Sequence, residues 1–488
     1  MNPQMLLVPI FSPVICAFLL LIPGPLQGLA NRRKFLAAVF CVHTLLSIML
    51  AFQPDMGFTL FYITDHLPIS FRLDNLGRVF SMLSSAMFFA AGIYSFDYMG
   101  HEENELRFYL FYLLVSGMLS GIAYSGNMMT LYLFFEATTL VSVPLVLHTL
   151  TKDAIAASFK YLFYSVGGAS LALIGFFFVY IYGSSLEFTD GGVLDMAKLA
   201  GNENAMLAAT LVAIIGFGAK AGMFPLHAWL PTAHPVAPAP ASAVLSGVIT
   251  KAGIFATARF VFQLVGADFI RGTFVQYAWL ALALFTVIMG SALAFKEPLL
   301  KTRLAYSSVS QVSYIQFGMA TLTSAGILGG MLHMVFHSII KDALFMAAGI
   351  IIYKTGKTRV DELSGMGKQM PVTMWCITLL GVALVGIPPA SGFVSKWQMA
   401  VGSLESGTGF FTWLGPVVLL ISALLTAGYL FQISINGFFP GNRVSSKSKP
   451  AAHEKADGGI LMLIPLIVLS ALAFLLGMFP SGLINLLS

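Results

Sequence analysis

The sequence predicts an all-α, polytopic membrane protein with about fourteen transmembrane helices. Hydrophobic residues make up 58% and charged residues 10% of the 488 residues, whereas soluble domains contain roughly 45–50% and about 25%. Apolar runs of spanning length recur along the chain. The longest polar stretches, 184–204 and 438–458, are too short to form a soluble domain. Any reaction that needs a bound nucleotide must therefore take place on another polypeptide.

The apolar runs give the predicted helices in chain order. Met1 to Gly24 has no basic segment and continues at spanning length, so we expect a transmembrane helix there rather than a signal peptide. The polar stretch 438–458 is expected to be a flexible loop. The predicted helices lie near 5–23, 35–53, 77–96, 107–124, 127–149, 159–183, 205–224, 240–262, 274–295, 302–321, 326–353, 371–394, 408–437 and 459–480.

The distribution of Lys and Arg predicts the orientation. If the first connection is cytoplasmic, the odd-numbered connections hold seventeen Lys and Arg residues, including Lys301, and the even-numbered connections hold five, including Arg259. Because cytoplasmic loops carry the excess of positive charge, we expect a multi-pass protein of the cytoplasmic (inner) membrane with both termini on the outer side. These loops also explain the net charge of +5, so no nucleic-acid partner is expected.

Two proline-rich segments predict helices that break inside the membrane. Five prolines fall within PLHAWLPTAHPVAPAP, which follows Lys220, and a similar interruption, GIPPASGFVSK, leads to Lys396. Two broken helices five spans apart are typical of transporters built from inverted repeats; the alternative is that the prolines only kink packed helices. The predicted parts are N-terminal helices 1–106, a first five-helix repeat 107–262, a second, inverted repeat 263–437, and a loop with a C-terminal helix 438–488.

Ionisable residues lie inside these apolar helices. Each costs about 2.5–3.5 kcal/mol at membrane depth, and five of them oppose insertion by something on the order of 15 kcal/mol. Every central cation is Lys rather than Arg, and a Lys ammonium in a dry site can release its proton whereas a guanidinium stays charged. We expect these residues to carry protons; static pairs that fix helix packing are the alternative. They are Glu136, its expected partner Lys220, and Lys251, Lys341 and Lys396.

A stripe of histidines on one helix extends this set. His333, His337 and Lys341 are spaced i, i+4, i+8 in LHMVFHSIIKDALF, so they lie on one helical face. We expect the stripe to pass protons between Lys251 and Lys396; core histidines without a transport role are the alternative. An HxxxH pair can bind zinc, but no third ligand is evident. The three cysteines have no CxxC spacing, so neither a metal nor a cofactor is expected.

Other polar residues are expected near the inner side of the membrane. His227 and His234 lie in the first proline-rich break, where they either gate proton uptake or have no role. Asp342 is expected to point off the stripe towards the inner rim. His148, at the end of the fifth helix, is expected to be part of an ordinary solvated interface.

The same segments resemble a known family. FFEATTLVS, GFGAKAGMFPLHAWLPTAHPVAPAPASAVLSGVITKAG, FKEPLLKTRLAYSSVSQ, MVFHSIIKDALFMAAG and GIPPASGFVSKW resemble signature blocks of antiporter-like membrane subunits. Respiratory complex I (NADH:quinone oxidoreductase), Mrp-type cation/proton antiporters and membrane-bound energy-converting hydrogenases share these subunits. The resemblance covers about 70–435. The positions that it matches to the family's proton path are Glu136 paired with Lys220, then Lys251, His333, His337, Lys341 and Lys396.

The resemblance implies a proton-translocating subunit without a redox centre of its own. Its expected partners are other membrane subunits of a complex I-like or hydrogenase-type oxidoreductase, and the alternative within the family is the proton-path subunit of an Mrp-type Na⁺/H⁺ antiporter, with any Na⁺ handled elsewhere in the complex. Lys396 differs from the glutamate of one complex I subunit type, and no long lateral helix is expected within this sequence. Outside the family, the competing hypotheses are a quinone-reducing enzyme, which no cofactor motif supports, and an inert scaffold.

Overall fold

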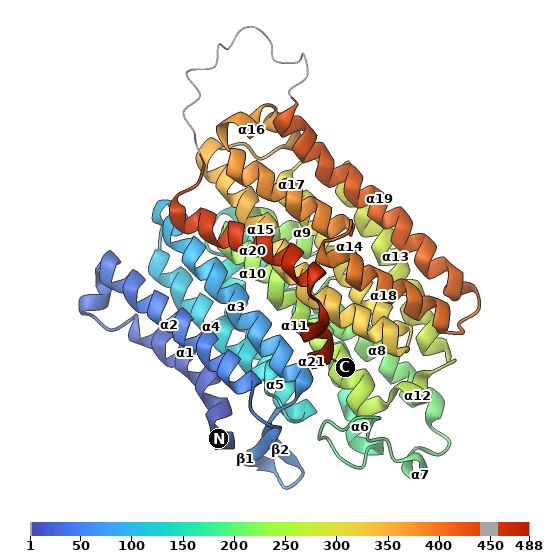
Figure 1. Cartoon of the computed structure of the whole chain (residues 1–488). Coiled ribbons are helices and arrows are strands. Elements are labelled where there is room, and N and C mark those ends of the chain that lie inside the picture. The colour runs from blue at the N-terminus through green and yellow to red at the C-terminus, as the bar shows by residue number, and fades with distance from the viewer. Residues whose placement is uncertain (1, 440–456, 488) are drawn as a thin grey trace.

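The computed structural model describes residues 2–439 and 457–487, and its helices are packed side by side in one bundle (Figure 1). The predicted loop 438–458 falls almost entirely outside the described residues. Eleven of the described helices are long and apolar enough to cross a membrane, and Pro3–Leu19 and Pro371–Val385 are shorter apolar helices. The chain is therefore a multi-pass membrane protein, and a helix lies at every predicted position.

The N-terminal part forms one edge of the bundle (Figure 1). It contains a β-hairpin, so the prediction of an all-α chain was wrong at this point. Phe58 and Phe71 pair across the two strands and stack at 5.7 Å. The elements are η1 (Pro3–Leu7), α1 (Val8–Leu19), η2 (Pro25–Gln27), α2 (Leu29–Ala51), β1 (Met56–Thr64), β2 (Leu67–Leu73), α3 (Asn75–Tyr98) and η3 (Met99–His101).

The next part contains the first broken helix. α8 ends at Ala221, Gly222 adopts a left-handed conformation with φ 84°, and the chain resumes as α9. Gly takes this conformation without a steric penalty, and the prolines that follow prevent the helix from continuing. The elements are α4 (Glu105–Ala123), α5 (Met128–Val146), α6 (Lys152–Tyr182), α7 (Met196–Leu199), α8 (Glu203–Ala221), α9 (Leu230–Val236), α10 (Ala239–Val244), the π-helix η4 (Leu245–Ile249), α11 (Thr250–Phe260), the π-helix η5 (Val261–Val265) and α12 (Ala267–Ile270).

The C-terminal part contains the second broken helix. α17 ends at Val385, Gly386 has φ 90°, and α18 begins at Ser391. The break was predicted, but the predicted end at 394 was wrong because the second half continues to Glu405. The elements are α13 (Phe274–Lys296), α14 (Leu300–Ala320), α15 (Ser324–Thr355), η6 (Val360–Leu363), α16 (Met366–Gln369), α17 (Pro371–Val385), α18 (Ser391–Glu405), α19 (Phe410–Phe438), α20 (Ile460–Met478) and α21 (Ser481–Leu487).

Helix α15 forms the centre of the bundle. It is the most completely buried of the eleven long apolar helices, and it packs against α3, α10 and η4 as well as against α14, α17 and α18. Helix α20 returns across the bundle to pack against α15 and α3 (Figure 1). Polar residues on α15 are therefore shielded from lipid by neighbouring helices.

Candidate functional site

Lys220 joins the first broken helix to α5. It lies in the last turn of α8 and is fully buried. Its Nζ donates hydrogen bonds to the carbonyl oxygen of Phe135 at 2.8 Å and to Oγ1 of Thr139 at 2.8 Å. The ammonium also lies 4.2 Å from the centre of the Phe135 ring, a favourable position for a cation. Lys220 is therefore held by neutral groups of a neighbouring helix.

Glu136 lies beside this lysine without pairing with it. Its side chain is half-buried, and its Oε1 accepts a hydrogen bond from the Tyr132 hydroxyl at 3.4 Å. The charges of Glu136 and Lys220 are near enough to interact, but no ion pair joins them in the described part of the chain, where such pairs are N···O contacts of 4.0 Å or less. Glu136 and Lys220 therefore interact over a distance in this structure but are not joined by an ion pair.

Lys251 lies in the middle of the bundle. It is fully buried near the start of α11, and its Nζ donates to the carbonyl oxygen of Ser246 at 2.5 Å. Thr250 donates to the same carbonyl at 2.9 Å. Ser246 belongs to η4, and π-helical turns of this kind occur frequently at functional sites. The lysine is thus bound by its own helix rather than by an acidic residue.

The predicted stripe on α15 is buried and points into the protein. His333 contacts Ser395 through Nδ1 at 2.9 Å and Gln311 through Nε2 at 3.0 Å. The rings of His333 and His337 stack with centroids 5.8 Å apart, and neither ring nitrogen of His337 has a hydrogen-bond partner among the described residues. Lys341 donates to the carbonyl oxygen of Leu304 on α14 at 2.9 Å.

Lys396 lies at the second break and contacts the stripe through an aromatic ring. Its Nζ donates to the carbonyl oxygens of Leu384 at 2.6 Å and Val385 at 3.0 Å, the last two residues of α17. It also lies 4.9 Å from the centre of the Tyr314 ring, and this ring stacks on His333 at 5.6 Å. The structure therefore brings together Lys396, Tyr314, His333 and His337.

The spacing between Lys220 and Lys251 is different. Within the described residues, no hydrogen bond or ring contact joins these two side chains. Their helices nevertheless pack closely, since a Cβ added to Gly253 on α11 would lie 2.5 Å from the carbonyl oxygen of Phe217 on α8. The two lysine side chains are therefore not directly connected, although their helices are in contact.

The two histidines of the first break occupy different environments. His227 is half-buried, with its ring 5.9 Å from that of Phe224 and with Lys160 near enough to interact. His234 is fully buried in α9, and its ring stacks on Phe345 at 4.4 Å. It interacts electrostatically with Lys251, Lys301 and Lys341. His234 is therefore shielded from solvent, and its expected role in proton uptake stays a prediction.

Three buried charges had been placed elsewhere by sequence reasoning. Lys301, counted with an inner connection, is only 8% exposed and donates to the carbonyl oxygen of Ala237 at 2.8 Å. Asp342, expected at the inner rim, is fully buried. Arg259, counted with an outer connection, is fully buried on α11 and pairs with both carboxylate oxygens of Asp74, at 2.5 and 2.8 Å. The interior thus holds an arginine as well as lysines.

No signal in the sequence separates these three residues from solvated ones. Lys301 lies in the charged segment FKEPLLKTR, and Asp342 directly follows Lys341. Outside the helices, His148 is also buried rather than solvated. Burial and the nearby Arg107 guanidinium lower the pKa of His148 to about 4, so this imidazole is neutral at pH 7.

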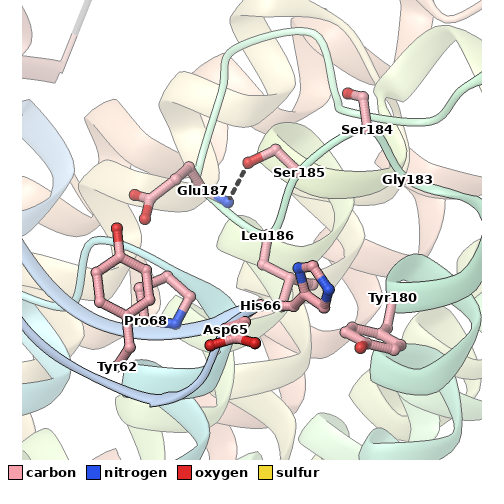
Figure 2. A pocket seen from close by; sticks show the side chains of 10 residues that line it. All are labelled: Tyr62, Asp65, His66, Pro68, Tyr180, Gly183, Ser184, Ser185, Leu186 and Glu187. Atoms are coloured by element: carbon pink, nitrogen blue, oxygen red, sulfur yellow. Dashed lines mark hydrogen bonds between the residues drawn. The ribbon is translucent and has the colours of Figure 1, made fainter.

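A surface cavity lies apart from the buried lysines. A surface cavity of about 450 Å³ lies between the β-hairpin and the segment after α6, lined by Tyr62, His66, Tyr180 and Glu187 among others (Figure 2). None of the buried lysines lines it. In the described ranges, no three His, Cys, Asp or Glu side chains are grouped to hold a metal ion.

Comparisons with known proteins identify the family of this chain. The family model for the NADH:quinone oxidoreductase/Mrp antiporter transmembrane region matches residues 125–426. Subunit N of the NADH-quinone oxidoreductase of Desulforudis audaxviator is 32% identical over 426 residues, which cover 86% of this chain and 83% of that protein. A subunit of the Na⁺/H⁺ antiporter of Bacillus subtilis is 30% identical over 410 residues, covering 83% of this chain and 79% of the antiporter subunit.

Solved structures show the same fold. A chain of the archaeal membrane-bound sulfane sulfur reductase superposes with a TM-score of 0.85 at 25% identity, with 99% of this chain and 96% of the other covered. A chain of respiratory complex I from Thermus thermophilus gives a TM-score of 0.81 at 22% identity, with 99% and 98% covered. Together with the family match over more than half of the sequence, these similarities show that the chain belongs to the family of antiporter-like membrane subunits that complex I, Mrp antiporters and hydrogenase-4 share.

Proposed function

We propose that this chain translocates protons as the antiporter-like subunit of a multisubunit complex. Protons enter from the cytoplasm near the first broken helix, pass along Lys220, Lys251 and the α15 stripe to Lys396, and leave on the outer side. Redox chemistry in neighbouring subunits of a complex I-like or hydrogenase-type assembly supplies the driving force. The relatives from complex I and hydrogenase-4 support this assignment.

One observation carries the proposal. In the described part of the chain, none of the four lysines of the proposed path forms an ion pair. Each ammonium donates to a backbone carbonyl oxygen instead, in Lys220, Lys251, Lys341 and Lys396. A buried ion pair opposes loss of the proton because deprotonation leaves an uncompensated carboxylate. A lysine on a neutral acceptor leaves no such charge behind. These lysines are therefore suited to gain and lose protons.

The two broken helices support a repeat in which 107–262 and 263–437 are related by inversion. Each break follows a helix that ends in a left-handed glycine, Gly222 or Gly386, and each lies near a lysine, Lys220 or Lys396. An odd number of spans in each repeat inverts its direction across the membrane. The positive-inside rule supports the proposal that both termini lie on the outer side.

The open Glu136–Lys220 pair provides the first step of the path. When a proton reaches Glu136, the carboxylate no longer stabilises the nearby ammonium, and Lys220 passes its proton towards Lys251. When Glu136 is ionised again, Lys220 is recharged. The alternative function, a proton path in an Mrp-type Na⁺/H⁺ antiporter, is supported by the Bacillus subtilis relative and uses the same residues with a Na⁺ gradient as the driving force.

The test uses the intact complex in sealed membrane vesicles. Lys220→Ala and Glu136→Gln are expected to abolish proton transport while assembly is unchanged, and Lys152→Ala, which alters an exposed lysine at the start of α6, serves as the matched control. Normal transport in either of the first two variants contradicts the proposal. Loss of assembly in both, with normal transport per assembled complex, indicates a scaffold. Energising the vesicles with Na⁺ alone or with an electron donor alone distinguishes the two complexes.

A further inference from the structure

Asp342 points away from the lysine beside it in the sequence. Lys341 reaches α14, where it donates to the carbonyl oxygen of Leu304. Asp342 faces η4, and its Oδ1 lies so close to Gly247 that a Cβ added to this glycine would clash with it. Glycine is therefore required at 247 while the carboxyl group occupies this position.

The carboxyl group is buried without a hydrogen-bond partner. Asp342 is fully buried, and in the described part of the chain neither of its oxygens has a donor. The ionisable groups near enough to interact with it are Lys251 on α11 and Tyr112 on α4. The Tyr112 hydroxyl already donates to the carbonyl oxygen of Phe88 at 2.8 Å. An isolated carboxylate is costly in such a site, so it requires either a nearby cation or a proton.

The π-helical turn η4 holds the cation next to this carboxyl group. Ser246 accepts the hydrogen bond of Lys251, and the next residue, Gly247, contacts Asp342. The Lys251 ammonium and the Asp342 carboxyl group thus contact consecutive residues of one turn, Ser246 and Gly247. The two groups do not form an ion pair of 4.0 Å or less among the described residues. Proton exchange between them therefore requires a bridging water or a side-chain rotation.

We propose that Asp342 exchanges a proton with Lys251 and holds it while the other residues of the path carry no transported proton. This inference rests on the proposed proton path. In the step, the N–H bond of the Lys251 ammonium breaks and an O–H bond forms on Asp342, which converts a cation and an anion into two neutral groups. The net charge of the site does not change. Lys251 can therefore be emptied and refilled without a proton moving along the whole row.

The first experiment compares Asp342→Asn with wild type in the assembled complex. Asn keeps the shape but cannot carry the proton, so transport should fall by roughly 100-fold with assembly unchanged. Difference infrared spectra should lose one carboxylic-acid C=O band in Asp342→Asn and keep that of Glu136. Normal transport in Asp342→Asn, when Lys220→Ala abolishes transport, overturns this inference alone. Normal transport in both variants overturns the proposed function.

A second set of variants separates packing from proton exchange. Gly247→Ala should prevent assembly because its methyl group would take the place of the carboxyl oxygen. The double variant Gly247→Ala/Asp342→Ala removes the clash and should restore assembly but not transport. Recovery of both assembly and transport in the double variant would show that Asp342 only fills space.

Discussion

Both broken helices are interrupted after a glycine with positive φ, but the lysines beside the two breaks have different hydrogen-bond partners. After α8, the carbonyl oxygen of Ala219 accepts from the Trp229 indole at 2.8 Å, so Lys220 is free to reach α5. After α17, the carbonyl oxygens of Leu384 and Val385 accept from Lys396 itself. The last carbonyls of a helix have no partner within the helix. Lys396 therefore caps the C-terminus of α17, whereas Lys220 donates to a carbonyl oxygen of the neighbouring helix α5.

This difference teaches that position at a break does not define a lysine's role. The resemblance matches both lysines to the family's proton path, and each lies next to a proline-rich segment. Lys396 combines proton transport, as proposed, with donation to two carbonyl oxygens at a helix end, whereas the carbonyl oxygen that Lys220 contacts has Thr139 as a second donor. A substitution at Lys396 therefore changes stability and transport together, whereas one at Lys220 separates them.

The largest expected effect comes from Lys396→Met, with Lys220→Met as the comparison. Lys396→Met should lower the free energy of unfolding by about 2–4 kcal/mol, because the carbonyl oxygens of Leu384 and Val385 at the end of α17 both lose their donor. Lys220→Met should change it by about 1 kcal/mol or less, because the Phe135 carbonyl keeps the Thr139 hydroxyl as a donor. Thermal unfolding of the purified complex in detergent measures both. Equal losses of stability in the two variants would remove the distinction.

An intermediate effect is expected from the glycines that end α8 and α17. Gly222→Ala and Gly386→Ala should each cost about 1–2 kcal/mol, because both residues have positive φ. An added Cβ at Gly386 lies 3.1 Å from Cδ of Lys396, whereas one at Gly222 meets Leu230. Transport should therefore fall more in Gly386→Ala. Gly356→Ala, at another left-handed helix end with open space around it, controls for backbone strain alone.

The smallest expected effect is at Trp229. Trp229→Phe keeps most of the ring packing on Tyr161 but removes the indole donor. The Ala219 carbonyl retains the Gly222 amide at 3.1 Å, so the loss should be about 0.5–1.5 kcal/mol. Transport per assembled complex should be unchanged. A larger loss of stability than in Lys396→Met would show that the indole, rather than the second lysine, is the more important cap.

The sequence predicts the helices and both breaks well because their signals are local. Apolar length identifies a helix, and glycine followed by prolines identifies its end. The β-hairpin also has a local signal, because two β-prone runs flank the two residues Asp65 and His66.

The directions of individual side chains could not be predicted in the same way. These helices are apolar on most sides, so the sequence does not show which side faces lipid and which faces protein. Asp342 and Lys341 are consecutive, yet they face different helices. The pairing of Arg259 with Asp74 joins residues 185 positions apart. Such contacts depend on how whole helices pack, which no local pattern encodes.

The position of α20 has a consequence for biogenesis. This helix packs against α3 as well as α15, α17 and α18, and together with α3 it lines an apolar groove that includes Met87 and Leu469. Helices enter the membrane in chain order during synthesis, so α3 meets lipid on this side until α20 arrives. Helix α3 therefore completes its packing only after α20 has been made.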